Sequence, residues 1–372
     1  MEWKEDVLGN VLEVKYGKDH KKLADGQYPV YGSGGLMRYV DSILYDGPSI
    51  LIPRKGTLNN IMFVDSPFWT VDTMFWSIIN TDKVDPKFLF YSICKRDFAS
   101  MNVGSAVPSM TVNILNDIQI SYPKNISDQR RIASILSSLD RKIELNNKIN
   151  ADLEEMAQAI FKNWFVDFEP FKNGKFVDSE LGMIPEGWKV GTLEDIAEIT
   201  MGQSPAGNSL NENGEGMIFY QGSSDFGFRF PSIRVFTTEP KRLAVANSVL
   251  FSVRAPVGDI NVAKEECCIG RGVASIKSKY GHDSYLFYAM KSLHKLFDSF
   301  DGEGTVFGSI NKKTLSAIQI LLPSDGIVEQ FNNVASSFDD RIRSLSDENS
   351  RLSLLRDTLL PRLMSGELEV PE

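Results

Sequence analysis

Residues 128–168 read DQRRIASILSSLDRKIELNNKINADLEEMAQAIFKNWFVDF, and this stretch carries a heptad pattern of apolar side chains. Steps of three and four residues separate most of its apolar positions, which is typical of a helix that packs against a second helix. Two polar residues, Lys142 and Asn146, interrupt the stripe. The residues expected in this helix–helix spacer seam are Ile132, Ile135, Leu139, Ile149, Leu153, Met156 and Ile160.

The same pattern returns 199 residues later, interrupted at Arg341 and Glu348. The matching seam positions are Phe331, Val334, Phe338, Leu345, Leu352, Leu355 and Leu359. Because the two stripes share one register, we expect two long helices that pack together as an antiparallel coiled coil. Ser127 is the predicted N-cap of the first helix, and Pro361 is expected to kink or end the second.

The segments between the helices are also repeated. WKEDVLGNVLEVKYGK from Trp3 aligns without gaps on WKVGTLEDIAEITMGQ from Trp188, and GSAVPSMTVNILNDIQISYP from Gly104 aligns on GTVFGSINKKTLSAIQILLP from Gly304. The middles, such as PSILIPRKG from Pro48 and NSVLFSVRAPVG from Asn247, match only loosely. The frame of each module is therefore repeated, whereas its interior varies.

Short β-branched or aromatic runs, punctuated by glycine and proline, predict strands in both modules. One amphipathic helix per module is expected, near Lys87 and near Ser284. The fold class is therefore mixed α/β, with two homologous modules, two long antiparallel helices and internal pseudo-two-fold symmetry. The expected domains are residues 1–126 (first module), 127–168 (central spacer helix), 169–326 (second module) and 327–372 (C-terminal spacer helix).

The chain resembles the specificity subunit of Type I restriction-modification enzymes. The resemblance rests on MIPEGWKVGTLEDIAEITMGQSP at Met183, on the module-closing pattern with glycine, Pro108, Leu115 and IQISYP, on the spacer at Asp128, and on LLPRLMSGELEV at Leu359. It implies target-recognition domains that each read half of a split site in double-stranded DNA. It also implies helices that dock two methyltransferase subunits, and through the complex the restriction (motor and nuclease) subunits. It implies no cofactor and no active site in this subunit.

Composition agrees with a folded protein of the cytoplasm. Apolar residues make up 42% of the 372 residues and charged residues 24%, which excludes wholesale disorder and a membrane channel. No apolar run is long enough to span a bilayer, and no secretory signal opens the sequence, so we expect no membrane partner. The three cysteines and three histidines lack ligand spacing, so no metal site is expected.

Catalytic motifs are missing from the sequence. A methyltransferase would need a glycine-rich cofactor loop and an Asn/Asp-Pro-Pro-aromatic motif, and the nearest match, Asp65-Ser66-Pro67-Phe68, replaces the first proline. The glycines at 32, 34 and 35 lack the Lys-Ser/Thr of a phosphate loop and predict a turn. A nuclease-like set at Asp225, Glu239 and Lys241 has no identifiable partner acid. We therefore expect a non-catalytic recognition subunit.

DNA-binding candidates are long polar side chains in turn-like surroundings, because arginine can bind guanine and asparagine or glutamine can bind adenine. In the first module they are Lys18, Lys21, Lys22, Arg38, Arg54, Lys55, Asn59 and Asn60. In the second they are Gln203, Gln221, Ser223, Arg229, Arg234, Arg254, Arg271, Lys312 and Lys313.

Net charge argues against strong non-specific DNA binding by this chain alone. The chain carries 40 basic and 49 acidic residues, a formal charge of −9, whereas counterion release on DNA requires basic side chains. Most non-specific affinity would therefore come from partner subunits. A tandem-module coiled-coil scaffold without a DNA-reading role stays open as the alternative, and the missing motifs disfavour a stand-alone nuclease or methyltransferase.

Overall fold

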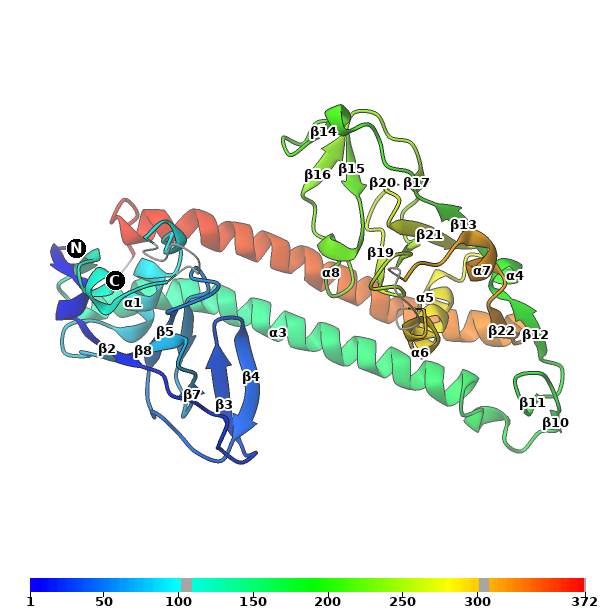
Figure 1. Ribbon diagram of the computed structural model, residues 1–372, viewed down its shortest axis with the longest axis horizontal. Helices are drawn as coiled ribbons and strands as arrows, with labels where there is room; N and C mark the ends of the chain where they lie inside the picture. The colour runs from blue at the N-terminus through cyan, green and yellow to red at the C-terminus, as the bar shows by residue number, and fades with distance from the viewer. Residues whose placement is uncertain (102–108, 301–307, 371–372) are drawn as a thin grey trace. The chain divides into compact units, whose positions relative to one another are not determined.

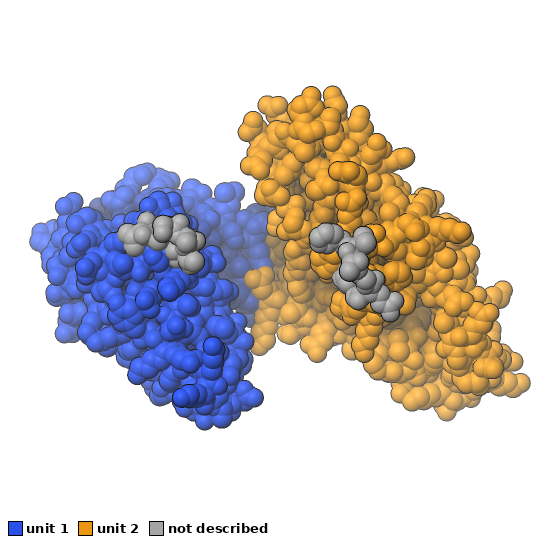
Figure 2. All heavy atoms as spheres, in the orientation of Figure 1, with its two compact units in different colours: residues 1–145, 348–372 blue, residues 146–347 orange. Residues whose placement is uncertain are grey.

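The computed structural model describes residues 1–101, 109–300 and 308–370, and the chain divides into two compact units (Figure 2). Unit 1 comprises residues 1–145 and 348–372, and unit 2 comprises residues 146–347. Each unit contains one α/β module and part of each of two long helices (Figure 1). The beginnings of the two repeated module-closing segments, residues 104–108 and 304–307, lie outside the described residues.

The two predicted long helices are confirmed. Helix α3 spans Ile126–Phe165 and helix α8 spans Asp325–Met364, 40 residues each, so each is about 60 Å long. Asn125, not Ser127, caps α3, because its side-chain oxygen accepts the Ser127 N–H at 2.9 Å. Pro361 lies inside α8 and does not end it.

Ion pairs within unit 1 give the relative direction of the long helices. Arg356 Nη1 lies 2.6 Å from Asp140 Oδ1, and Lys142 Nζ lies 3.3 Å from Glu348 Oε2. A step forward along α3 is thus matched by a step backward along α8. The helices run antiparallel here, as predicted.

The predicted seam is only partly buried. The prediction was wrong for Met156, Val334 and Leu355, which are 51%, 40% and 46% exposed. From Asn150 onward the buried residues of α3 in unit 2 are Asn150, Glu154, Ala157, Phe161 and Phe165, and the first four each lie one residue after a predicted seam position. The shift arises because the helix also packs on the module, and two polar side chains occupy the buried face where an apolar pattern cannot reveal them.

The strands in the described part of the first module form three small sheets. An antiparallel ladder joins β1 (Trp3–Val7) to β9 (Gln119–Pro123). A four-stranded sheet has the order β2-β8-β5-β6, with strands Leu12–Tyr16, Met74–Ile79, Ser49–Pro53 and Met62–Val64. The third sheet has the order β4-β3-β7, with strands Gly35–Val40, Tyr28–Gly32 and Trp69–Thr70. The short helices are α1 (Pro86–Ile93), α2 (Val112–Asn116), η1 (Leu8–Asn10) and η2 (Ala99–Met101).

The second module repeats this plan with additions. Its ladder joins β12 (Lys189–Thr192) to β22 (Gln319–Leu322), after a short pair β10 (Phe176–Val177) and β11 (Ile184–Pro185). The four-stranded sheet β13-β21-β18-β19 uses Ala197–Met201, Val273–Ser278, Val249–Ser252 and Ile260–Val262. The five-stranded sheet β14-β16-β15-β20-β17 uses Leu210–Asn211, Val235–Thr237, Met217–Tyr220, Cys267–Ile269 and Leu243–Ala244. Its helices are α4 (Leu193–Ile196), α5 (Asp283–Ser292), α6 (His294–Asp298), α7 (Lys312–Ser316), η3 (Glu169–Phe171), η4 (Gly207–Ser209) and η5 (Ser223–Asp225).

Strand pairing shows that the repeat extends through the interior of the modules. The parallel pairing of β3 with β7 recurs between β15 and β20. The order of the four-stranded sheet is also the same in both modules. The loose sequence match in the middle of each module therefore conceals a common backbone, and the mixed α/β fold class with two homologous modules is confirmed.

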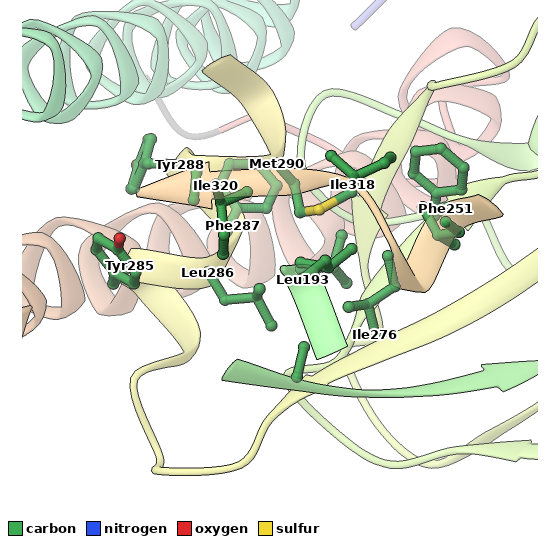
Figure 3. Close-up of a cluster of buried hydrophobic side chains, with 14 of the residues drawn as sticks. Leu193, Phe251, Ile276, Tyr285, Leu286, Phe287, Tyr288, Met290, Ile318 and Ile320 are labelled. Atoms are coloured by element: carbon green, nitrogen blue, oxygen red, sulfur yellow. The ribbon is translucent and has the colours of Figure 1, made fainter. Parts of the chain in front are cut away.

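Aromatic and aliphatic side chains of α5 fill the core of unit 2. Figure 3 shows Tyr285, Leu286, Phe287 and Tyr288 among side chains from the neighbouring strands and α4. Phe165 of α3 lies 5.2 Å from Tyr285, measured between ring centroids. The long helix is thus part of the core of this unit, and burial of these rings stabilises its attachment.

Each module makes an equivalent tyrosine–aspartate hydrogen bond to a long helix. The Tyr91 hydroxyl donates to Asp140 Oδ2 at 2.6 Å, and the Tyr288 hydroxyl donates to Asp339 Oδ1 at 3.1 Å. Asp140 and Asp339 are separated by the same 199 residues as the two heptad patterns. The repeat therefore includes the docking of module on helix.

Gly17 and Gly202, which the repeat aligns, both lie against a neighbouring backbone segment that leaves no room for a side chain. A Cβ atom on Gly17 would lie 2.0 Å from the Val71 carbonyl oxygen, and one on Gly202 would lie 2.2 Å from the Gly270 carbonyl oxygen. Only a residue without Cβ allows the loop after the strand to approach this backbone.

We expect Gly202→Ala to lower the free energy of unfolding by about 1–3 kcal/mol, because the methyl group forces the two backbone segments apart. Chemical denaturation of the full chain measures the change. Gly207→Ala is the matched control, since a Cβ atom on Gly207 would have nothing within 4 Å. Equal stability of the two variants would contradict this account of the glycine.

Candidate nucleic-acid interface

The same four-residue turn lies at the end of the four-stranded sheet in each module. The turn comprises residues 71–74 in the first module and 270–273 in the second. The Met74 N–H donates to the Val71 carbonyl, and the Val273 N–H donates to the Gly270 carbonyl, both at 3.0 Å. These hydrogen bonds leave Asp72 and Thr73, or Arg271 and Gly272, at the tip.

Two further loops attach to this turn by matching backbone hydrogen bonds. The Gly17 N–H donates to the Met74 carbonyl at 3.0 Å, and the Arg54 N–H donates to the Thr73 carbonyl at 2.8 Å. The corresponding bonds in the second module run from Gly202 to Val273 at 2.9 Å and from Val253 to Gly272 at 3.0 Å. We call this surface the three-loop edge; it consists of residues 17–18, 54–55 and 71–74, or of residues 202–203, 253–254 and 270–273.

Four predicted DNA-binding residues of the second module gather at its three-loop edge. Gln203, Arg254 and Arg271 belong to its loops, and all three are exposed. The Arg271 N–H donates to Ser204 Oγ at 3.3 Å, and this hydroxyl donates to Gln221 Oε1 at 3.0 Å. Gln221 is thus fixed beside the turn, and together these side chains present amide and guanidinium groups to solvent.

Lys18, Arg54 and Lys55 gather at the edge of the first module. The Lys18 N–H donates to the Thr70 carbonyl at 2.9 Å, and the Lys55 N–H donates to the Thr73 carbonyl at 3.2 Å. The Arg54 guanidinium lies 5.4 Å from the centroid of the Tyr16 ring, a cation–π contact that orients it. This edge therefore carries three cations and the acid Asp72, whereas its counterpart carries two arginines and no acid.

Other candidates of the first module lie away from the edge or hold its loops together. Asn59 donates to Asp97 Oδ1 at 3.1 Å, and Asn60 donates to the Ser33 carbonyl at 2.8 Å. Arg38 is half-buried and donates to the Leu23 carbonyl at 2.7 Å. These side chains support loop structure. Two candidates, exposed in the loop before β3, are Lys21 and Lys22.

The remaining candidates of the second module are dispersed. Arg234 is 58% exposed and pairs with Asp225 at 3.1 Å. Ser223 begins η5 and is half-buried. Lys312 and Lys313 are exposed at the start of α7.

Arg229 must be removed from the set of DNA-reading candidates, because its side chain is only 3% exposed. Its Nη2 lies 3.1 Å from Glu154 Oε2 on α3, and its Nη1 lies 2.7 Å from Asp339 Oδ1 on α8. Nη2 also donates to the Tyr288 hydroxyl at 2.8 Å. Arg229 therefore joins its module to both long helices within unit 2, and no duplex can reach it.

A second cation completes this buried cluster. Lys291 forms an ion pair with Glu154, and burial lowers the pKa of the Lys291 amine. The Arg229 guanidinium lies 4.0 Å from the centroid of the Phe287 ring. Two carboxylates and two cations thus neutralise one another, which is the condition for burying charge at acceptable cost.

Neither a metal site nor a membrane span is found in residues 1–101, 109–300 and 308–370. No group of three or more histidine, cysteine, aspartate or glutamate side chains there is arranged to hold a metal ion. No helix in those segments is both long and apolar enough to cross a bilayer. Phe68, in the segment nearest to a methyltransferase motif, is fully buried and belongs to the core of the first module.

A family model for the Type I restriction modification DNA specificity domain matches residues 1–155 and 185–352, one match for each module. The chain belongs to this family. It is 33% identical over 300 residues to a putative type I restriction enzyme MjaX specificity subunit of Methanocaldococcus jannaschii, covering 78% of this chain and 70% of the relative. Another relative, the MjaIX specificity subunit of the same organism, is 26% identical, covering 95% of this chain and 86% of the relative.

A solved structure shares the fold of the chain. The S subunit of a Type I restriction-modification system from M. genitalium superposes with a TM-score of 0.62 at 17% sequence identity, covering 97% of this chain and 96% of that one. The two-module plan and the long helices are therefore the fold of this family.

Sequence reasoning missed Asp72 at the tip of the first turn. The DNA-binding candidates were chosen among basic, amide and hydroxyl side chains, so an aspartate was not considered. The 199-residue offset of the repeat places Asp72 on Arg271, and the matching backbone hydrogen bonds of residues 71–74 and 270–273 show that the two positions are equivalent.

Proposed function

We propose that each module reads one half of a bipartite, non-palindromic DNA site through its three-loop edge, in the major groove. The observation that supports this most directly is that one backbone arrangement is built twice with different exposed side chains. Lys18, Arg54 and Lys55 mark the first edge, whereas two glutamines and two arginines mark the second. A shared backbone that carries different base-contacting side chains suits a protein whose two half-sites differ in sequence.

The proposed division of labour follows the chain. Residues 1–126 and 169–326 would be the recognition domains, and residues 127–168 and 327–372 would be spacer helices that set the distance between the half-sites. The 40-residue helices α3 and α8 support this role, since helices of about 60 Å can fix a separation.

The proposed partners are two methyltransferase subunits, docked on the spacer helices, and restriction subunits that join through the complex. The sequence has no catalytic or cofactor motif of its own, so methylation of adenine and cleavage would be carried out by those partners. A net charge of −9 supports the same view, because a partner must supply most of the contacts to phosphates.

Exchange of one module tests the proposal. Replacing residues 1–126 with the first module of a specificity subunit that has another target should change one half of the methylated sequence and leave the other half intact. The donor should keep a tyrosine at position 91, because its hydroxyl binds Asp140 of α3. Genome-wide mapping of methylated adenine gives the result, and a change in both half-sites would contradict independent reading.

A further inference from the structure

Asp72 and Arg271 occupy the same position in the two modules. Each is the second residue of a four-residue turn closed by a 3.0 Å hydrogen bond. Each turn accepts the N–H of the glycine that the repeat aligns, Gly17 or Gly202, and is preceded by a strand that pairs in parallel with β3 or β15. Both side chains are exposed.

The two side chains have opposite hydrogen-bonding chemistry. Arginine only donates, and its forked guanidinium matches O6 and N7 of guanine. Ionised aspartate only accepts, and it matches the amino group of cytosine. Within the described parts of the chain, neither the Arg271 guanidinium nor the Asp72 carboxylate has an ion-pair partner within 4.0 Å, so both are available to a ligand.

On the basis of the proposed function, we propose that this turn position determines one base in each half-site. Arg271 selects guanine in the second half-site. Asp72 selects cytosine in the first half-site by accepting a hydrogen bond from the cytosine amino group.

The surroundings of each residue agree with this assignment. Ser204 holds the Arg271 backbone and also Gln221, so a glutamine amide lies beside the guanidinium for the neighbouring base. In the first module, the Arg54 guanidinium donates to the Asp72 carbonyl at 3.4 Å and Lys55 follows it in the chain. The cations at positions 54 and 55 can bind phosphates. Phosphates repel the carboxylate at position 72, so this carboxylate can bind DNA favourably only through a base amino group.

The test uses the full chain assembled with its methyltransferase partner, and it maps methylated adenines in cells. Arg271→Ala should relax one guanine position of the second half-site, with discrimination at that position falling roughly 5- to 150-fold, the equivalent of one bidentate base contact. Asp72→Ala should relax one cytosine position of the first half-site. Arg271→Lys, which keeps the charge but loses the fork, should recover only part of the discrimination.

Binding of purified complex to site variants separates reading of a base from contact with a phosphate. A uniform loss of affinity across all sequences, with an unchanged base preference, would overturn the proposal, as would an unchanged methylation pattern in either alanine variant. Lys175→Ala, an exposed lysine in the loop after α3, is the control. If the parent complex showed no bipartite site, the proposed function itself would fail; if it showed one and these variants did not alter it, only this inference would fail.

Discussion

Replacing Arg229 with methionine is expected to lower the free energy of unfolding of the chain by about 3–5 kcal/mol, the usual result of breaking a buried ion pair. The variant leaves Glu154, which is 6% exposed, paired with Lys291 alone among the described residues, and it breaks the ion pair of Arg229 with Asp339. It also removes the hydrogen bond to the Tyr288 hydroxyl. Urea denaturation followed by circular dichroism measures the loss.

Two comparisons show whether charge imbalance is the cause. The double variant Arg229→Met with Glu154→Leu should recover part of the stability, because it removes one cation and one carboxylate together and leaves the cluster without net charge. Arg234→Met, which breaks an ion pair of a 58% exposed arginine, should cost less than about 1 kcal/mol. An Arg229→Met protein that is as stable as the parent but has altered base preference would return Arg229 to the DNA-reading set.

Arg229 also shows where reading the sequence fails. The segment around it, residues 225–231, contains three phenylalanines, one glycine and one proline and predicts an exposed loop. Its burial depends on Glu154, 75 residues earlier, and Asp339, 110 residues later. Residue pairs that are so far apart in the sequence leave no periodic signal. The sequence alone therefore predicts a loop around Arg229 but not that two helices bury its side chain.

The long helices and the repeat could be predicted because their signals are local or periodic. Heptad spacing identified α3 and α8, and the alignment of the first and last segments of each module identified the two modules. In unit 2 the buried face of α3 was predicted one residue away from its true position, since Glu154 is buried by its ion pairs with Arg229 and Lys291 of the second module. Asp72 and Arg271 are separated by the same 199 residues as the two heptad patterns, but the sequences around them share little, so their equivalence becomes clear only from the matching hydrogen bonds.

Lengthening both spacer helices by one heptad is expected to lengthen the gap between the half-sites by about three base pairs. Seven helical residues add about 10 Å, and duplex DNA advances about 3.4 Å per base pair. Insertions after Leu145 and after Asp347 fall at the boundaries of the two compact units. They therefore leave intact the contacts of Asp140 with Tyr91 and of Asp339 with Arg229, which hold each module to its own helix segments.

The half-site sequences should stay the same in the heptad variant, because no residue of either three-loop edge changes. Binding should be weaker than in the parent, since three added base pairs also turn one half-site by about 100° around the duplex axis. Inserting two residues instead of seven would rotate the following helix by about 200° and turn its buried stripe outward, so loss of folding or assembly is expected. Methylation mapping decides the matter: if both half-sites were still modified at the parental spacing, the helices would not set the distance between them.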